Sequence, residues 1–247
     1  MEIVGESIQA LDYFLAGVPA YGYFELQVFG LKDLVNKSRT DNGLNQTAEV
    51  CLIALSAYFE AFCKAQFAAV INICPPVVNN FIEKRKGTTL DLRNVLAVLA
   101  QTGLLEHKLG FLLSEDNDFG SAKNINTLYF DLLGITPFSA KEKKEYEKFL
   151  SDRNLLVHHG GIYTFKYLAQ RFRTRTAPGL PNWSSLVVDK DDHDRWAAFL
   201  AGIAHKIAST SKAALEAYVK GGRLFLTPEQ AKAVAYLCDQ PCKISRP

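Results

Sequence analysis

Several patterns that mark common enzyme classes are missing from this sequence. It has no glycine-rich loop for binding phosphate, no H-E-x-x-H zinc motif and no G-x-S-x-G nucleophile elbow. It also has no internal repeat and no low-complexity tract. These absences weaken the case for an enzyme whose chemistry is built on one of those motifs.

The chain also lacks a strong charge of either sign. Lysine and arginine total 28 against 26 aspartate and glutamate residues, so the formal net charge is only +2. A whole-molecule charge this small does not by itself indicate a nucleic-acid partner. Any basic surface that binds nucleic acid must therefore be local.

The five cysteines do not form a pattern typical of a metal centre. Cys51, Cys63 and Cys74 lie in one apolar segment, where small hydrophobic side chains are expected to be buried. Cys238 and Cys242 form an isolated C-x3-C pair, whereas a structural zinc ion needs about four ligands. We therefore expect free thiols, no bound metal and no cofactor.

A long uncharged apolar run is absent as well. The most apolar stretch, residues 50–78, is interrupted by Glu60 and Lys64 and closed by Pro75-Pro76, whereas a membrane-spanning helix needs about 20 nearly uncharged residues. The first residues include two glutamates and do not resemble a secretory signal peptide. We expect a cytoplasmic protein in a reducing compartment, with no membrane contact.

What the sequence does contain is the pattern of an all-α protein. Apolar residues recur at helical spacing most clearly over residues 47–73, which end at the two prolines. Start and stop signals predict further helices, over residues 79–86, 91–114, 121–133, 139–158 and 191–219 and from residue 227 onward. We expect three parts: an N-terminal helical addition (1–40) of two short helices, a helical domain (41–222), and a C-terminal helix and tail (223–247).

The helix over residues 139–158 has the clearest boundaries. Ser139 and Glu142 form a capping box at its start, and Gly160-Gly161 ends it. Residues 162–190 then change character, with strand-forming side chains at both ends and prolines between them. We interpret this stretch as a small irregular or β-hairpin insertion.

The end of this helix carries the residues of chemical interest. The apolar stripe through Tyr146 and Phe149 is predicted to continue onto Arg153, Asn154 and His158. Charged side chains at core-facing positions need a partner, a hydrated cleft or a subunit interface. Arg153 and His158 are five residues apart, about 140° around an ideal helix, so they converge only if the arginine bends round or two copies meet.

The segment Arg153-Asn-Leu-Leu-Val-His158 resembles the signature of HEPN domains (higher eukaryotes and prokaryotes nucleotide-binding), an arginine and a histidine with four to six residues between them. The similarity is specific over residues 140–220, looser over residues 47–133, and absent from the two ends of the chain. It implies an all-α helical bundle of HEPN type. It also places the helix over residues 139–158 as the motif helix.

The resemblance implies a metal-independent endoribonuclease. His158 would transfer a proton, Arg153 would stabilise charge on the scissile phosphate, and Asn154 would position Arg153 or the phosphate. Histidine suits proton transfer because imidazole ordinarily titrates near neutral pH. The resemblance further implies a homodimer with a composite site, and a role as a toxin or abortive-infection effector restrained by an antitoxin or regulatory protein.

Basic and aromatic residues follow the motif without any acidic neighbour over residues 153–188. Of these we select Lys166, Arg171 and Arg173, together with His159, as RNA-binding candidates, because cations neutralise phosphates and aromatic rings stack on unpaired bases. The alternative is a basic loop whose aromatic rings pack underneath it. His159 has a similar alternative, since a solvated histidine also suits a helix C-terminus.

Each of two residue pairs has two possible roles. Glu60 and Lys64 are either a supporting pair that faces the site or an ordinary surface pair spaced i,i+4. Arg153 and His158 are either catalytic or a structural polar pair in a relative that has lost activity. The second case would make the chain a binding module for RNA, a nucleotide or a protein.

Overall fold

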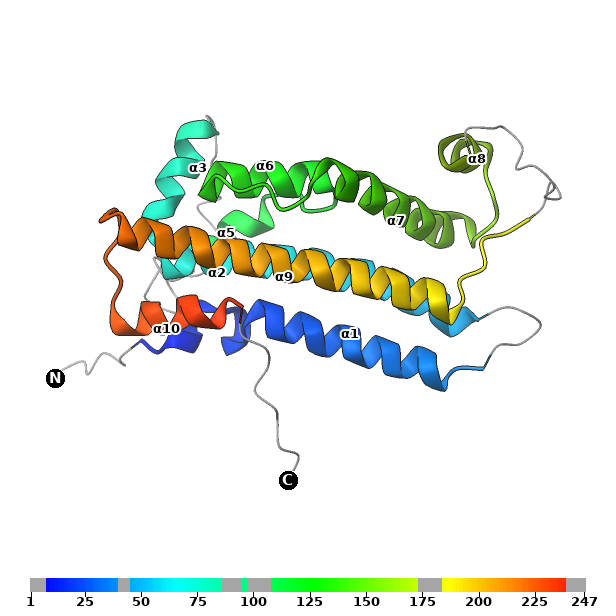
Figure 1. Ribbon diagram of the computed structural model, residues 1–247, viewed down its shortest axis with the longest axis horizontal. Coiled ribbons are helices and arrows are strands. Elements are labelled where there is room, and N and C mark those ends of the chain that lie inside the picture. The colour runs from blue at the N-terminus through cyan, green and yellow to red at the C-terminus, as the bar shows by residue number, and fades with distance from the viewer. Residues whose placement is uncertain (1–7, 40–44, 86–94, 97–107, 173–183, 239–247) are drawn as a thin grey trace, which may run out of the picture. The chain divides into compact units, whose positions relative to one another are not determined.

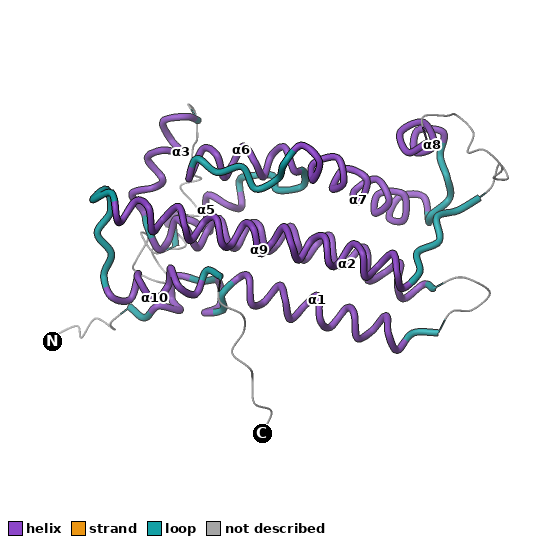
Figure 2. The backbone as a smooth tube through the Cα atoms, in the orientation of Figure 1, coloured by secondary structure: helices purple, strands orange, loops and turns teal. Residues whose placement is uncertain are grey.

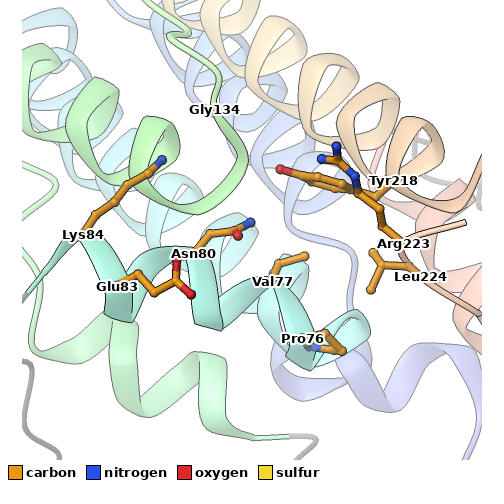
Figure 3. Close-up of a pocket in the computed structure, with 9 residues that line it drawn as sticks. All are labelled: Pro76, Val77, Asn80, Glu83, Lys84, Gly134, Tyr218, Arg223 and Leu224. Carbon is orange, nitrogen blue, oxygen red and sulfur yellow. The ribbon is translucent and has the colours of Figure 1, made fainter. Parts of the chain in front are cut away.

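The computed structural model describes residues 8–39, 45–85, 95–96, 108–172 and 184–238. Helices make up almost all of the regular structure in these ranges, and no strand occurs within them (Figure 2). One isolated antiparallel bridge joins Ile162 and Ser185. The prediction of an all-α class is confirmed.

The elements follow one another along the chain as labelled in Figure 1. They are η1 (Ala10–Tyr13), η2 (Leu15–Gly17), α1 (Ala20–Lys37), α2 (Gln46–Ile73), η3 (Pro75–Val77), α3 (Val78–Lys84), α5 (Leu109–Glu115), α6 (Ala122–Leu133), α7 (Ala140–His159), α8 (Phe165–Phe172), α9 (Lys190–Lys220) and α10 (Pro228–Tyr236).

The chain divides into two compact units, each built from separate stretches of sequence. The first unit comprises residues 1–25, 61–137 and 203–247. The second comprises residues 26–60 and 138–202. Helices α1, α2 and α9 contribute residues to both units.

The core of the first unit is centred on the ring of Phe67. Its centroid lies 5.6 Å from that of Phe81, 5.5 Å from that of Phe119 and 5.8 Å from that of Tyr129, with edge-to-face geometry in each case. Such aromatic pairs stabilise a core beyond the apolar area that they bury. The C-terminal half of α2 is thereby joined to α3 and α6.

A buried amide joins three elements of the first unit. The Asn72 side chain donates to the carbonyl of Tyr13 and accepts a 2.8 Å hydrogen bond from the backbone N–H of Gly110. A side chain at Gly110 would not fit, because an added Cβ would lie only 2.1 Å from the carbonyl oxygen of Ala68. The glycine therefore lets α5 approach the backbone of α2.

The core of the second unit is an aromatic row that carries α7. The Phe59 ring packs on Tyr146, Tyr146 stacks on Phe149, and Phe149 packs on Trp196. All four side chains are buried. These contacts fix one face of α7 against α2 and α9, and leave its other face for the site described below.

The helices near the two ends of the chain match the sequence predictions to different degrees. The N-terminal region was predicted to hold two short helices broken by glycines, but α1 runs for 18 residues through both Gly22 and Gly30. Helix propensity is a weak effect, and packing of the buried face overrides two glycines. At the other end, the capping box of Thr227 and Gln230 starts α10 as predicted.

Helix α2 is long enough and apolar enough, by length and composition alone, to cross a membrane. Half of its most apolar 18-residue window is buried inside the protein. Core helices of globular proteins meet the same criterion.

The predicted helix over residues 91–114 lies mostly outside the described residues, and its end corresponds to α5.

Candidate functional site

Helix α7 begins and ends where the sequence predicts. The Ser139 hydroxyl accepts from the Glu142 amide, and the Glu142 carboxylate accepts from the Ser139 amide at 2.7 Å. At the other end Gly160 adopts the left-handed conformation, with φ at 55°. Because both boundaries are set locally, the position of the motif residues at the end of the helix is also set locally.

The face of α7 that is buried differs from the predicted one. The buried positions are Tyr146, Phe149, Asp152, Leu155 and Leu156. The prediction that Arg153 and His158 continue the core-facing stripe is therefore wrong. Arg153 is half-buried, whereas Asn154 and His158 are exposed. The buried charge on this helix is Asp152, one residue before the predicted one.

The stretch after α7, predicted as a small irregular or β-hairpin insertion, begins with the helix α8, and residues 173–183 lie outside the described residues. The Thr164 hydroxyl accepts a 3.1 Å hydrogen bond from the Tyr167 amide and so caps the start of α8. What remains of the predicted hairpin is the bridge at Ile162, where Tyr163 N–H donates to Ser184 and Leu186 N–H donates to Gly161. Local capping outweighed strand propensity, which depends on a neighbouring strand.

Asp152 ties α8 to α7. Its carboxylate accepts a 2.8 Å hydrogen bond from the Tyr167 hydroxyl and lies 3.6 Å from the Arg171 guanidinium. The Tyr167 ring also stacks on Tyr163, with centroids 5.4 Å apart. Burial raises the pKa of Asp152, while the Tyr167 hydrogen bond and the Arg171 charge act in the opposite direction. Figure 1 shows α8 beside the C-terminal end of α7.

A hollow of about 400 Å³ lies between these two helices. Its lining brings together Asn154, His158 and His159 from α7 with Lys166 from α8. The other lining residues are Ser151, Leu155, Thr164, Tyr167 and Gln170.

The chemistry of the hollow suits an anion. Among its described lining residues are one lysine, two histidines and an asparagine, and none carries a carboxylate. Hydrogen-bond donors and a cation around a small hollow can hold a phosphate group, and an imidazole can exchange a proton with a bound hydroxyl. No group of three or more metal-ligating side chains occurs in the part of the chain that the structure describes.

Arg153 lies next to this hollow without lining it. Its Nη1 donates a 2.8 Å hydrogen bond to Asn154 Oδ1, so the guanidinium is linked to the hollow through Asn154. Its Nε is buried and has no hydrogen-bond partner among the described residues. A guanidinium has five N–H donors, so those outside the bond to Asn154 and the buried Nε can still bind an oxygen of a ligand or of another chain.

The structure does not place the remaining predicted site residues in the hollow's described lining. Arg171 is half-buried and committed to Asp152, so it does not line the hollow. Arg173 lies outside the described residues. Glu60 and Lys64 are half-buried on α2, each with interactions of its own, and Glu60 is not part of the hollow's lining.

Sequence reasoning missed the two residues that organise the site, Asp152 and Tyr167. The signal for Asp152 was available, because it lies three residues after Phe149 and six after Tyr146, on the buried side of α7. A buried carboxylate needs partners. The tyrosine and arginine that follow, at positions 167 and 171, are spaced i,i+4 on one helical face and provide them.

No protein-family model, curated protein or solved structure matches this chain. The features that bear on function are the chain's own residues and the similarity of the segment around Arg153 and His158 to the HEPN signature. The hollow adds a physical reason to treat that segment as a site.

Proposed function

We propose that this chain is a metal-independent endoribonuclease with a HEPN-type helical bundle. The observation that supports this most is the hollow in which His158, His159, Lys166 and Asn154 meet with no carboxylate among the described lining residues. A phosphodiester is an anion with hydroxyl groups beside it, and this set of donors and imidazoles matches both features. A basic hollow with a proton-transfer group fits cleavage of RNA better than of DNA, because only RNA carries the 2′-hydroxyl nucleophile.

In the proposed reaction His158 accepts the proton of the ribose 2′-hydroxyl. The 2′-oxygen then attacks phosphorus, the bond from phosphorus to the 5′-oxygen breaks, and a proton passes to the departing 5′-oxygen. The products are a 2′,3′-cyclic phosphate and a 5′-hydroxyl. Lys166 and Arg153, with Asn154 holding the guanidinium, stabilise the charge that builds on the phosphate oxygens.

The placement of Arg153 supports a dimeric form of this proposal. The guanidinium does not line the hollow of its own chain, and its Nη1 donates to Asn154, which does. Two copies of α7 facing each other would bring arginine and histidine from different chains to one phosphate. A nuclease of this kind needs restraint, and the resemblance suggests a toxin or anti-phage effector that is controlled by an antitoxin or regulatory protein.

The test is cleavage of total RNA in the presence of EDTA. His158→Ala should lower the rate by about 10²–10⁴-fold, because one acid–base group contributes that much. His205→Ala is the matched control, since His205 is also exposed but lies on α9. Fragments ending in 2′,3′-cyclic phosphate support the mechanism. Equal cleavage by His158→Ala and the parent contradicts it.

The second candidate is a module that binds RNA without cutting it. The observation that favours it is that Arg153 is bonded to Asn154 and is not among the lining residues of the hollow. Such a module would bind RNA with an affinity that falls on His158→Ala or Lys166→Ala. It would produce no cyclic-phosphate ends with any RNA.

A further inference from the structure

The C-terminal part of α1 is apolar on two sides. Val28 and Val35 face inward and are only 6% and 2% exposed. Leu26, Phe29 and Leu34 are 43%, 69% and 55% exposed. A helix on the surface of a globular protein normally carries polar residues on its outer face. The outer face of α1 therefore has the composition of a contact surface.

A glycine lies at the centre of this outer face. Gly30 is exposed in the interior of α1, and a Cβ added there would meet nothing within 4 Å. Glycine destabilises a helix interior relative to alanine, and no neighbour within the chain requires it here. Close approach of a second helix would use the missing side chain, because the crossing point of two helices is where their backbones come nearest.

The residues around Gly30 are arranged symmetrically. Leu26 and Leu34 lie four residues before and after it, and Gln27 and Asp33 lie three residues before and after it. In an antiparallel pair of α1 helices with a two-fold axis through Gly30, each Leu26 faces the other copy's Leu34. Each Gln27 amide likewise comes opposite the other copy's Asp33 carboxylate, which accepts its hydrogen bond.

We propose that α1 is the docking surface for a second copy of this chain, as an antiparallel helix pair that crosses at Gly30. Self-association through one surface requires each residue to match its own two-fold mate, and Leu26 with Leu34 and Gln27 with Asp33 meet this requirement. The charge on this face also favours a protein partner over an anionic membrane. Residues 26–37 carry Lys32, Asp33 and Lys37, a formal net charge of only +1, and Asp33 and Lys37 form a 2.6 Å ion pair.

The proposed register can be tested by exchanging its apolar pair for charges. The helix pair has two Leu26–Leu34 contacts, and Leu26→Glu alone places a carboxylate against a leucine in both. This should weaken association by at least about tenfold in Kd, which corresponds to about 1.4 kcal/mol. The double variant Leu26→Glu with Leu34→Lys places opposite charges together twice and should recover association. The matched control, Leu26→Glu with Leu34→Glu, places like charges together and should lose the association through α1.

The measurement is sedimentation of each full-length variant over a concentration series, with circular dichroism as the check that the helices are retained. Both leucines are exposed, so the substitutions do not disturb the core. Gly30→Cys adds an independent readout, because two cysteines on the axis should form a reducible disulfide between copies. Gly202→Cys is its control, since Gly202 is an exposed helical glycine with open space around it on α9.

Three results would overturn the proposal. One is a parent chain that stays monomeric at every concentration, whether or not α1 binds lipid vesicles. Another is a charge-paired double variant that associates no better than the like-charged control. The third is equal crosslinking at positions 30 and 202. The disulfide at position 30 reports the pairing of α1 itself, so the outcome depends neither on RNA cleavage nor on a pairing of copies through α7.

Discussion

The hydroxyl of Tyr167 donates a 2.8 Å hydrogen bond to the buried carboxylate of Asp152. This single bond joins α8 to α7 beside the candidate site. Lys166 precedes Tyr167 directly, so its place in the hollow depends on the same anchor. Any change that frees α8 is therefore expected to alter the hollow before it alters the aromatic core of the unit.

Replacement of Tyr167 by phenylalanine tests this anchor. The change leaves a buried carboxylate without its hydrogen-bond donor, which should lower the free energy of unfolding by about 1–3 kcal/mol. Tyr58→Phe is the control, because Tyr58 is a half-buried tyrosine of α2 in the same unit. Urea denaturation of both variants provides the comparison. Equal losses of stability would show that the bond to Asp152 contributes nothing particular.

The raised pKa of Asp152 predicts a specific dependence of stability on pH. Burial makes the folded state hold the carboxyl proton more tightly than the unfolded state does. The stabilising effect is therefore complete below the ordinary aspartate pKa of about 3.9 and is lost as the pH rises through the raised value. Asp152→Asn cannot titrate, so the parent should lose stability relative to this variant as the pH rises from about 4. Parallel stability curves would contradict the prediction.

His193 predicts sensitivity to acid. Its side chain is fully buried, its Nδ1 lies 3.7 Å from Asp194 Oδ1, and neither ring nitrogen has a hydrogen-bond partner among the described residues. Burial lowers the pKa of His193, and the Asp194 carboxylate only partly offsets this. The unfolded state therefore takes up the proton first, so stability falls as the pH drops below about 6.5.

The matching substitution is His193→Leu, which removes the titrating group without leaving a polar atom unsatisfied. This variant should be as stable as the parent near neutral pH or more stable, and should lose less stability between about pH 7 and 5. Thermal unfolding at a series of pH values measures the difference. A larger acid loss in the variant would mean that His193 is not the group responsible.

The hollow predicts how RNA binding responds to salt. Lys166→Ala removes one phosphate contact, so RNA affinity should fall and the slope of log affinity against log salt should decrease by about 1. Lys220→Ala is the control, because Lys220 is an exposed lysine at the end of α9. Filter binding at several salt concentrations distinguishes the two. An unchanged slope for Lys166→Ala would remove this residue from the interface.

The parts of the structure that the sequence predicted are those controlled by local signals. The capping box at Ser139, the cap at Ser121 and the two glycines after α7 each act within a few residues of chain, and each helix boundary there is as predicted. The start of α9 shows that such signals locate a helix boundary only to within a residue or two. The sequence predicts a start at residue 191, whereas the Asp189 carboxylate accepts a 2.8 Å hydrogen bond from the Asp192 amide and α9 starts at Lys190.

The parts that the sequence did not predict depend on tertiary packing. A shift of one position along α7 rotates the helix by about 100°, which is enough to exchange Arg153 for Asp152 on the buried face. The extension of α1 through Gly30 likewise depends on the packing of its buried face. The motif itself could be found from the sequence, but the residues that hold its surroundings in place could not.

Every described residue that lines the hollow lies between Ser151 and Gln170, a stretch of 20 consecutive residues. Most binding sites are formed by side chains from distant parts of a chain, so a change of ligand preference requires substitutions in several separate segments. In the proposed function, the whole binding surface therefore comes from one short passage of sequence. Transplanting that passage between related chains would transfer ligand preference together with its own Asp152–Tyr167 anchor, while the aromatic row on the opposite face of α7 keeps the host core unchanged.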